Sequence, residues 1–509
     1  MISNYRNILQ YRADTHPERV ALIYKDEHIS YAQLNTYAIE CANWFLKNGI
    51  KKGDRIAFLD FNNQNYVHLI NGCLICGIVP VSINWRSTSG DINYILKDAE
   101  CKLFLYGENF NKLITDATSD INIETKSIDA LSKIIFNEIY NTELLTPIVE
   151  ENDLALLIYT SGTTGKPKGV KISYDNIFEM YQSLRNETPL FGAASVNLIA
   201  GPWYAIVGVG YFIFGIYTGC TNVLLQYFDP METCEIIEKY KVTNAFLAPV
   251  MMQVICGLDE IKEYDLSSLQ NIQYGGSPIS VEQLLLCYNT FNCFFTQGYG
   301  LTETSGIATA LRFDDHEKIL LNKDPEQKKL LRSAGKPYAG VEIKIINEIN
   351  ETNTINEIGE VCLKGKVIAQ GYWNMSGVNE KIFQEDGWLH TGDMGYLDEK
   401  GYLFLVDRKN DLIISKGINI YPAEIELIIN QHPQIKECAV IGIPHEIHGE
   451  NICVVVVSDQ RDLQLIELRT WAKNKLADYK LPSRLEIVDQ LPRNATGKIL
   501  RKELRVLFK

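Results

Sequence analysis

Residues 160–169 form a stretch rich in glycine, hydroxyl and lysine side chains, Thr160-Ser161-Gly162-Thr163-Thr164-Gly165-Lys166-Pro167-Lys168-Gly169. It follows an apolar run at 154–159 that predicts a buried strand. Glycines let the backbone approach a ligand closely, while hydroxyls, amides and lysines suit the oxygens and charge of a polyphosphate. It is not a Walker loop, because two residues instead of four separate Gly162 from Gly165-Lys166, and Pro167 stands where that loop has Ser or Thr. The simpler alternative is a Ser/Thr/Gly surface loop without a ligand.

Length and composition indicate a soluble protein of more than one domain. The chain has 509 residues, of which 46% are hydrophobic and 22% are charged. A net charge of −14 argues against nucleic acid or an anionic membrane as a partner, so a bound phosphate must be held by local cations. No apolar secretory signal is visible at the N-terminus, and we therefore expect a cytoplasmic protein.

Two features raise alternatives that the sequence disfavours. Twelve cysteines are scattered, mostly inside apolar runs, and Cys73 and Cys76 have metal-ligand spacing without a second pair. We expect buried free thiols in a reducing compartment. Residues 188–228 contain no charged side chain and could be a membrane span, but Pro202 and several glycines interrupt them. We predict that residues 188–228 form a buried core segment and not a transmembrane segment.

The first part of the chain alternates between strand-like and helix-like segments. This alternation predicts an α/β fold with layers around a largely parallel sheet. We expect one helix that begins with a capping box at 30–33 and ends at Gly49, and a second helix at 66–76. We expect strands at 55–59 and 78–83. Residues 111–150 are polar and uninformative, and residues 314–336 are charged and are expected to form a loop.

Two more glycine-bearing turns follow predicted strands. The first is Tyr274-Gly275-Gly276-Ser277-Pro278, and the second is Gln297-Gly298-Tyr299-Gly300-Leu301-Thr302-Glu303-Thr304. Together with the stretch at 160–169 they predict one crevice at the carboxyl edge of a sheet, where folds of this kind bind ligands.

The composition changes near residues 406–411. Beyond them a helix from Ala423, strands at 438–443, 452–458 and 485–488, and a helix through Trp471 predict a small α+β domain. We therefore expect a large domain at 1–406 and a small domain at 407–509. The small domain ends in a basic tail, 491–502, on an otherwise acidic protein, which by itself is often only a solvated charge run. The sequence stops seven residues after Lys502, so we expect no fused carrier domain.

These motifs, in this order, resemble the adenylate-forming (AMP-binding) superfamily, most closely the bacterial medium- and long-chain acyl-CoA synthetases. The resemblance covers essentially the whole chain. Its markers are the three turns above, Gly359–Glu360 with Gly371-Tyr372-Trp373, residues 387–393, Asp407–Arg408, Lys416-Gly417 with 424–426, and 494–498. It implies a large α/β domain and a small mobile C-terminal domain. It also implies an acid–thiol ligase that uses ATP and Mg²⁺ to make an acyl-AMP and transfers the acyl group to coenzyme A.

The resemblance assigns roles to individual residues. Residues that would hold the phosphates are Thr160, Ser161, Gly162, Thr163, Thr164, Gly165, Lys166 and Lys168. Residues that would form the adenine slot are Gly276, Ser277, Pro278, Gly298, Tyr299 and Gly300, and Thr302 would donate to the α-phosphate. Glu303 and Thr160 would hold Mg²⁺. Asp393 would bind the ribose, Arg408 the ribose or a phosphate, and Lys498 would stabilise the charge that develops during adenylation.

The resemblance also predicts a moving small domain. Asp407 is the hinge candidate, and residues 413–417, including Gly417, would line the thiol tunnel. One position departs from the family pattern, because Ala205 stands where relatives often carry a histidine that gates the acyl site. This departure puts the shape of the acyl pocket in doubt.

The sequence leaves the acid and the acceptor open. Because residues 188–228 offer no partner for a buried charge, an apolar monocarboxylate, a fatty or aryl acid, is favoured. The alternatives are an acyl-AMP ligase or stand-alone adenylation enzyme that loads a separate carrier protein, and a catalytically silent nucleotide-binding protein. Glu303, Asp393, Arg408 and Lys498 together disfavour the silent protein.

Overall fold

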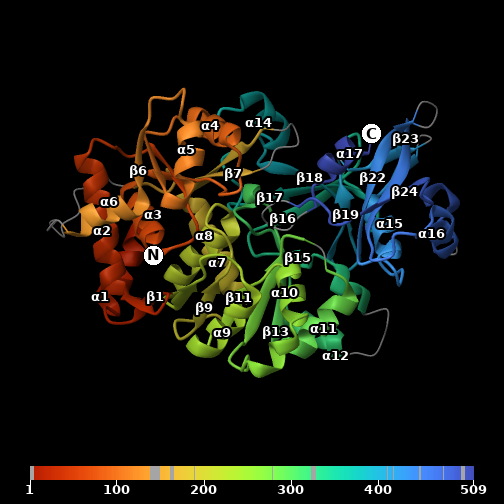
Figure 1. The fold of residues 1–509 in the computed structure, drawn as a ribbon, viewed down its shortest axis with the longest axis horizontal. Coiled ribbons are helices and arrows are strands. Elements are labelled where there is room, and N and C mark those ends of the chain that lie inside the picture. Colours follow the sequence, from red (N-terminus) through yellow and green to blue (C-terminus); the bar gives the residue numbers. More distant parts are fainter. Residues whose placement is uncertain are drawn as a thin grey trace. The chain divides into compact units, whose positions relative to one another are not determined.

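The structure, a computed structural model, describes residues 5–137, 149–160, 166–188, 190–277, 279–321, 328–409, 411–415, 418–445, 449–473, 475–493 and 499–508. The chain divides into two compact units, residues 1–342 with 363–389, and residues 343–362 with 390–509 (Figure 1). Residues 343–362 and 390–406 thus group with the C-terminal part. Domain limits of 1–406 and 407–509 remain a prediction from the sequence.

The largest sheet of the first unit is mostly parallel. Its strands, in spatial order, are β15 (Lys336–Pro337), β14 (Thr309–Leu311), β13 (Phe294–Tyr299), β12 (Asn271–Gly275), β11 (Asn244–Phe246), β9 (Val196–Ile199), β10 (Thr221–Leu224), β1 (Val20–Tyr24) and β2 (Glu27–Ser30). The strands from β13 to β1 run parallel, and antiparallel strands close both edges. This confirms the predicted α/β class.

A second parallel sheet and a hairpin complete the strands of this unit. The sheet contains β4 (Val79–Ser82), β3 (Arg55–Leu59), β5 (Leu103–Tyr106) and β6 (Glu124–Ser127). The hairpin pairs β7 (Leu154–Thr160) with β8 (Lys168–Ser173), and β7 packs beside β4. Leu157 of β7 joins the apolar core of the second sheet, so the hairpin is held by buried side chains.

Helices cover these sheets. They are α1 (Tyr5–Thr15), α2 (Tyr31–Lys47), α3 (Gln64–Cys76), α4 (Ser89–Asp98), α5 (Asn111–Ala117), α6 (Ile128–Asn137), α7 (Tyr174–Glu187), α8 (Ile206–Thr218), α9 (Pro230–Tyr240), α10 (Pro249–Cys256), α11 (Val281–Phe291), α12 (Phe313–Leu321) and α14 (Ser376–Ile382). The predicted capping box is present at the start of α2, where Ser30 and Gln33 satisfy each other's backbone amides. Figure 1 shows α9 to α12 gathered around β11 and β13.

The uncharged stretch 188–228 lies in the core. Its helix α8 has 13 residues, and those from Gly208 to Tyr217 are buried. A membrane-crossing helix needs about 20 apolar residues. Within the described residues, no helix combines the length and the apolarity needed to cross a bilayer. The cysteines are free; Cys101 and Cys256 are half-buried and the others are buried, as the sequence predicted.

The second unit contains two sheets. The first has β16 (Glu342–Ile346), β17 (Gly359–Lys364), β18 (Trp388–Leu397) and β19 (Leu403–Arg408), some of whose end residues belong to the first unit. The second has β21 (Ile418–Ile420), β20 (Ile413–Ser415), β23 (Gly449–Val457) and β22 (Glu437–His445), with β24 (Arg484–Val488) also paired to β23. Its helices are α15 (Pro422–Ile429), α16 (Leu465–Ala472) and α17 (Arg501–Leu507).

Helices cover both faces of the β22–β23 pair. Val440 faces a cluster that includes Ile425 of α15 and Leu468 of α16. Its neighbour Ile441 faces another cluster that includes Leu504 of α17. Successive side chains of a strand point to opposite faces, so two covered faces explain why this strand is apolar without a break.

One sequence expectation is wrong. Residues 314–336 were expected to form a loop, but residues 313–321 form α12, and a short 3₁₀ helix follows at 329–332. The charged residues of α12 lie partly on an outer face, while His316 and Ile319 are buried. The charge that suggested a loop is therefore that of an amphipathic helix.

A half-buried carboxylate after β3 makes stability depend on pH. Asp60 accepts hydrogen bonds from the Phe61 amide and from the Asn63 side chain, both at 2.8 Å. Burial nevertheless raises its pKa from 3.8 to about 6. The native state then holds this proton more tightly than the unfolded chain, so the free energy of unfolding falls as the pH rises from about 4 to about 6.

We expect Asp60→Asn to lose this dependence. Between pH 4 and pH 7 the parent should lose roughly 2–3 kcal/mol more unfolding free energy than Asp60→Asn does. Urea denaturation at a series of pH values measures it, with the exposed Asp116→Asn as the control. A difference that does not change with pH would contradict the assignment. Any fixed loss from the altered contact with Asn63 leaves the slope unaffected.

Candidate active site

The predicted phosphate-binding stretch connects β7 to β8. Thr160, the last residue of β7, pairs directly with Lys168, the first residue of β8. The ammonium of Lys166 lies 5.1 Å from the ring centroid of Tyr94, and that of Lys168 lies 5.0 Å from the ring centroid of Tyr372. Both lysines are therefore attached to aromatic faces by cation–π contacts. Ser161, Gly162, Thr163, Thr164 and Gly165 lie outside the described residues.

The two later glycine turns lie side by side. Strands β12 and β13 are parallel neighbours, and Gly275 pairs with Gly298. A Cβ on Gly275 would lie 2.2 Å from the Gly298 carbonyl oxygen, so only glycine permits this approach. Gly276 has a φ of +80°, which turns the chain toward Ser277 at the carboxyl end of β12. The structure thus brings the residues predicted for the adenine slot together; Pro278 lies outside the described residues.

The second turn continues into the predicted metal ligand. Tyr299 ends β13 and is buried, and a Cβ on Gly300 would lie 2.4 Å from the Gly306 carbonyl oxygen. Thr302 and Glu303 then form a single 3₁₀ turn, against which β8 packs. The strand that carries Lys168 and the turn that carries Glu303 are therefore neighbours.

Glu303 is held at both its backbone and its side chain. Its carbonyl oxygen accepts a hydrogen bond from the Ala369 amide at 2.9 Å. Its Oε1 accepts a hydrogen bond from the hydroxyl of Tyr372 at 2.6 Å. The sequence identified Tyr372 only as a family marker and gave it no role, since nothing in its local pattern relates it to a residue 69 positions earlier.

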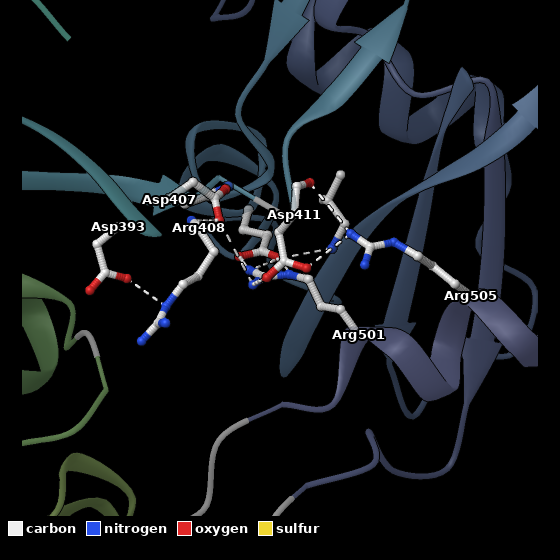
Figure 2. Close-up of polar contacts among 9 residues, drawn as sticks. Asp393, Asp407, Arg408, Asp411, Arg501 and Arg505 are labelled. Atoms are coloured by element: carbon white, nitrogen blue, oxygen red, sulfur yellow. Dashed lines mark hydrogen bonds and ion pairs between the residues drawn. The ribbon is translucent and has the colours of Figure 1, made fainter. Parts of the chain in front are cut away.

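In the second unit the two predicted ribose residues form an ion pair. Asp393 of β18 and Arg408 of β19 are register partners, and Arg408 Nε lies 2.5 Å from Asp393 Oδ1 (Figure 2). The Asp393 amide donates to Thr391 Oγ1 at 3.0 Å, and Gly392 has a φ of +71°. Asp393 is buried; Arg408 pairs with its carboxylate, and Thr391 holds its backbone amide.

Glu360 supports the same turn and was not given a role by the sequence. Its carboxylate accepts the Gly392 amide at 3.1 Å and pairs with Lys409 at 2.9 Å. His390 Nδ1 lies 3.6 Å from the same carboxylate. One buried glutamate thus holds Gly392, which precedes Asp393, and Lys409, which follows Arg408.

The hinge candidate Asp407 belongs to a buried cluster of charges. Its Oδ1 accepts the Arg408 amide at 2.7 Å and its Oδ2 accepts the Ala423 amide at 2.8 Å. The guanidinium of Arg501 lies 3.9 Å from Asp407 and 2.8 Å from both oxygens of Glu426. Burial raises the pKa of Asp407, and the charge of Arg501 opposes that rise.

Asp411 completes this cluster, which Figure 2 shows. It lies 3.3 Å from Arg501 and 2.9 Å from Arg505. Burial also raises the pKa of Glu426, again against the charge of Arg501. Burial works against the positive charge of Arg501 itself, yet Glu426 and Asp407 raise its pKa further above the ordinary value. Gly417 and Lys498 lie outside the described residues.

The residues predicted to hold a metal ion have suitable chemistry. Thr160 and Glu303 offer oxygen donors, which Mg²⁺ prefers. Among the described residues, no group of three or more His, Cys, Asp or Glu side chains could hold a metal ion. Mg²⁺ is usually bound through one or two carboxylates together with substrate phosphates and waters, so a single carboxylate beside the phosphate-binding hairpin fits it.

Ala205 begins α8 as its N-cap residue and is half-buried. Trp203 is buried against Tyr66 and Phe212, and Tyr204 is buried as well. Burial raises the pKa of Tyr204 to about 12, and the positive charge of Arg86 partly opposes this. The two residues that precede Ala205 in the chain are thus buried aromatic side chains.

Comparisons with known proteins identify the family of the chain. The family model "AMP-binding enzyme" matches residues 9–373, and the model "AMP-binding enzyme C-terminal domain" matches residues 424–498. A fatty acid–[acyl-carrier-protein] ligase of Streptomyces coeruleorubidus is 31% identical, over 98% of this chain and 95% of the relative. A long-chain-fatty-acid–CoA ligase of Mycobacterium tuberculosis is also 31% identical, over 98% and 97%.

A solved structure extends the likeness to three dimensions. The o-succinylbenzoate coenzyme A synthetase of Bacillus subtilis, in complex with ATP and magnesium ion, is 31% identical, with a TM-score of 0.86 over 98% of this chain and 99% of that one. Full-length relatives and two family models in the predicted order confirm the resemblance that the motifs indicated. The chain therefore belongs to the family of AMP-binding enzymes, the adenylate-forming ligases.

Proposed function

We propose that this enzyme activates an apolar monocarboxylic acid, a fatty acid first of all, and transfers it to the thiol of coenzyme A. The observation that carries the proposal is the convergence of Lys168 and Glu303 on one side chain, Tyr372. A phosphate-binding lysine beside a metal-binding carboxylate is what a nucleoside triphosphate requires. The ligase relatives, one of them solved with ATP and magnesium ion, support the same chemistry.

In the first half-reaction a carboxylate oxygen of the acid attacks the α-phosphorus of ATP. The bond from that phosphorus to the bridging oxygen breaks, and pyrophosphate leaves. Lys166 and Lys168 would hold the leaving phosphates, and Thr302 would donate to the α-phosphate. Glu303 and Thr160 would hold Mg²⁺, which would neutralise charge on the phosphates. Lys498 would stabilise the negative charge shared by the acid and the α-phosphate without transferring a proton.

In the second half-reaction the thiol sulfur attacks the acyl carbonyl carbon, and AMP leaves. Asp393 and Arg408 would keep the ribose in place during both steps. The hinge at Asp407 would turn the small domain between the two steps, so that Lys498 gives way to the thiol.

The acid is favoured to be apolar because residues 188–228 offer no charged partner. The relatives named above act on fatty acids and on o-succinylbenzoate, by their names, and one of them uses an acyl carrier protein. That carrier-protein relative supports a second candidate, in which the acceptor is a carrier protein in place of coenzyme A. Arg86, whose charge acts on Tyr204, is the reason to include dicarboxylic acids in the test.

The test is pyrophosphate release over a panel of fatty, aryl, dicarboxylic and amino acids, followed by thioester formation with coenzyme A and with an acyl carrier protein. Fatty acids should exceed amino acids of similar length by orders of magnitude, because burying an unpaired ammonium would cost several kcal/mol and each ~1.4 kcal/mol is about tenfold. Efficient pyrophosphate exchange with a free α-amino acid would overturn the substrate class. Thioester formation with the carrier alone would establish the second candidate.

A further inference from the structure

The segment Gly371–Trp373 is fixed against the phosphate-binding hairpin. The Trp373 amide donates to the Gly169 carbonyl at 2.7 Å, and the Lys171 amide donates to the Gly371 carbonyl at 2.9 Å. Tyr372 itself forms a bridge with Val170, and its amide donates to the Asn379 side chain at 2.7 Å. The backbone of Tyr372 therefore moves with β8, the strand that begins with Lys168.

The side chain of Tyr372 then makes two contacts with different parts of the site. Its hydroxyl donates to Glu303 Oε1, and its ring face carries the ammonium of Lys168. Tyr372 is only 5% exposed, while Glu303 and Lys168 are half-buried, so both contacts are partly shielded from water. A buried hydroxyl that donates to a carboxylate makes a strong, charge-assisted hydrogen bond.

The contact leaves one oxygen of Glu303 available. The hydroxyl of Tyr372 occupies Oε1, and among the described residues the Oε2 of Glu303 has no hydrogen-bond donor. A ligand carboxylate whose second oxygen is fixed by an outer hydrogen bond is the usual arrangement around bound metals. The geometry is that of a metal ligand held in advance by its neighbour.

We propose that Tyr372 is a positioning residue that orients Glu303 toward Mg²⁺ through its hydroxyl and Lys168 toward the phosphates through its ring. The inference rests on the proposed function, since it assumes that Glu303 holds Mg²⁺. The two parts of the Tyr372 side chain have different roles: the hydroxyl orients the metal ligand Glu303, and the ring orients Lys168. Each part is removed by a different substitution.

Tyr372→Phe removes the hydroxyl and keeps the ring. We expect the affinity for Mg²⁺ in the presence of ATP, measured by titration calorimetry without acid or thiol, to fall about 10–100-fold, as for other outer-shell partners of metal ligands. Binding of ATP in the presence of EDTA should stay within about twofold of the parent. Tyr372→Leu, which also removes the ring, should weaken the binding of ATP in EDTA as well.

The matched control is Tyr31→Phe, which removes a buried hydroxyl that donates to the Cys220 carbonyl at 2.7 Å, away from these motifs. It should leave the Mg²⁺ affinity unchanged even if it lowers the thermal midpoint. Parent-like Mg²⁺ affinity in Tyr372→Phe would overturn the proposal while leaving the proposed function intact. A parent protein that does not bind ATP with Mg²⁺ would instead refute the proposed function.

Discussion

Replacing Lys498 by alanine is expected to reduce acyl-AMP formation by at least a factor on the order of 10²–10³, the typical loss when a preorganised charge partner is removed. Acid-dependent pyrophosphate release measures this step. Thioester formation from supplied acyl-AMP and coenzyme A should stay close to the parent rate, because in the proposed mechanism the lysine serves only the first half-reaction. The C-terminal family model extends to this residue, which supports its assignment.

Lys502 provides the control for this prediction. It is an exposed lysine of α17 in the same basic tail, and Lys502→Ala removes the same charge from the chain. We expect both half-reactions of this variant to match the parent. If Lys498→Ala lost both half-reactions equally, the assignment of the lysine to one of two conformations would be wrong.

Replacing Arg501 by methionine is expected to lower the stability of the C-terminal unit by about 3–5 kcal/mol, the usual effect of removing one partner from a buried ion pair. Arg501 is the common partner of Glu426, Asp411 and Asp407, and Figure 2 shows it beside the two aspartates. Without it, three carboxylates would face one another, and among the described residues only Arg505 would still pair with one of them. Methionine retains most of the apolar stem of the arginine side chain. The loss of stability would therefore come mainly from the missing charge and less from a cavity.

Hydrogen exchange of the amides of α15 and β22, together with the thermal midpoint, measures this loss in the full-length protein. Arg505→Gln is the matched control, since Arg505 lies on the same helix and pairs only with Asp411 among these carboxylates. It should lose about 1 kcal/mol or less, as partly exposed pairs do. Arg501→Lys should fall between the two, because lysine keeps the charge but not the forked donor. Equal stability of Arg501→Met and Arg505→Gln would show that the cluster does not depend on Arg501.

Much of the fold was predictable because short segments carry their own signals. The capping box at Ser30 and Gln33 and the apolar run before Thr160 depend on neighbours a few residues away. Gly275 and Gly276 mark a turn that needs glycine, because a Cβ on Gly275 would meet the Gly298 carbonyl oxygen and Gly276 has a positive φ. Such local features predicted the α/β class and most of the candidate site, whereas the charged pattern of 313–321 was ambiguous between a loop and the outer face of a helix.

By itself the sequence determined the family, through the order of its motifs, and the residue types that the chemistry needs. Only the tertiary structure decided which distant side chains meet. Tyr372 reaches Glu303 over 69 positions and Arg501 reaches Glu426 over 75, and neither contact follows from periodicity or spacing. The spatial order of the strands is also not the order of the chain, since β9 lies between β11 and β10. Local sequence patterns indicate which face of a helix or strand is buried. Which distant side chain packs against that face depends on how the sheets assemble.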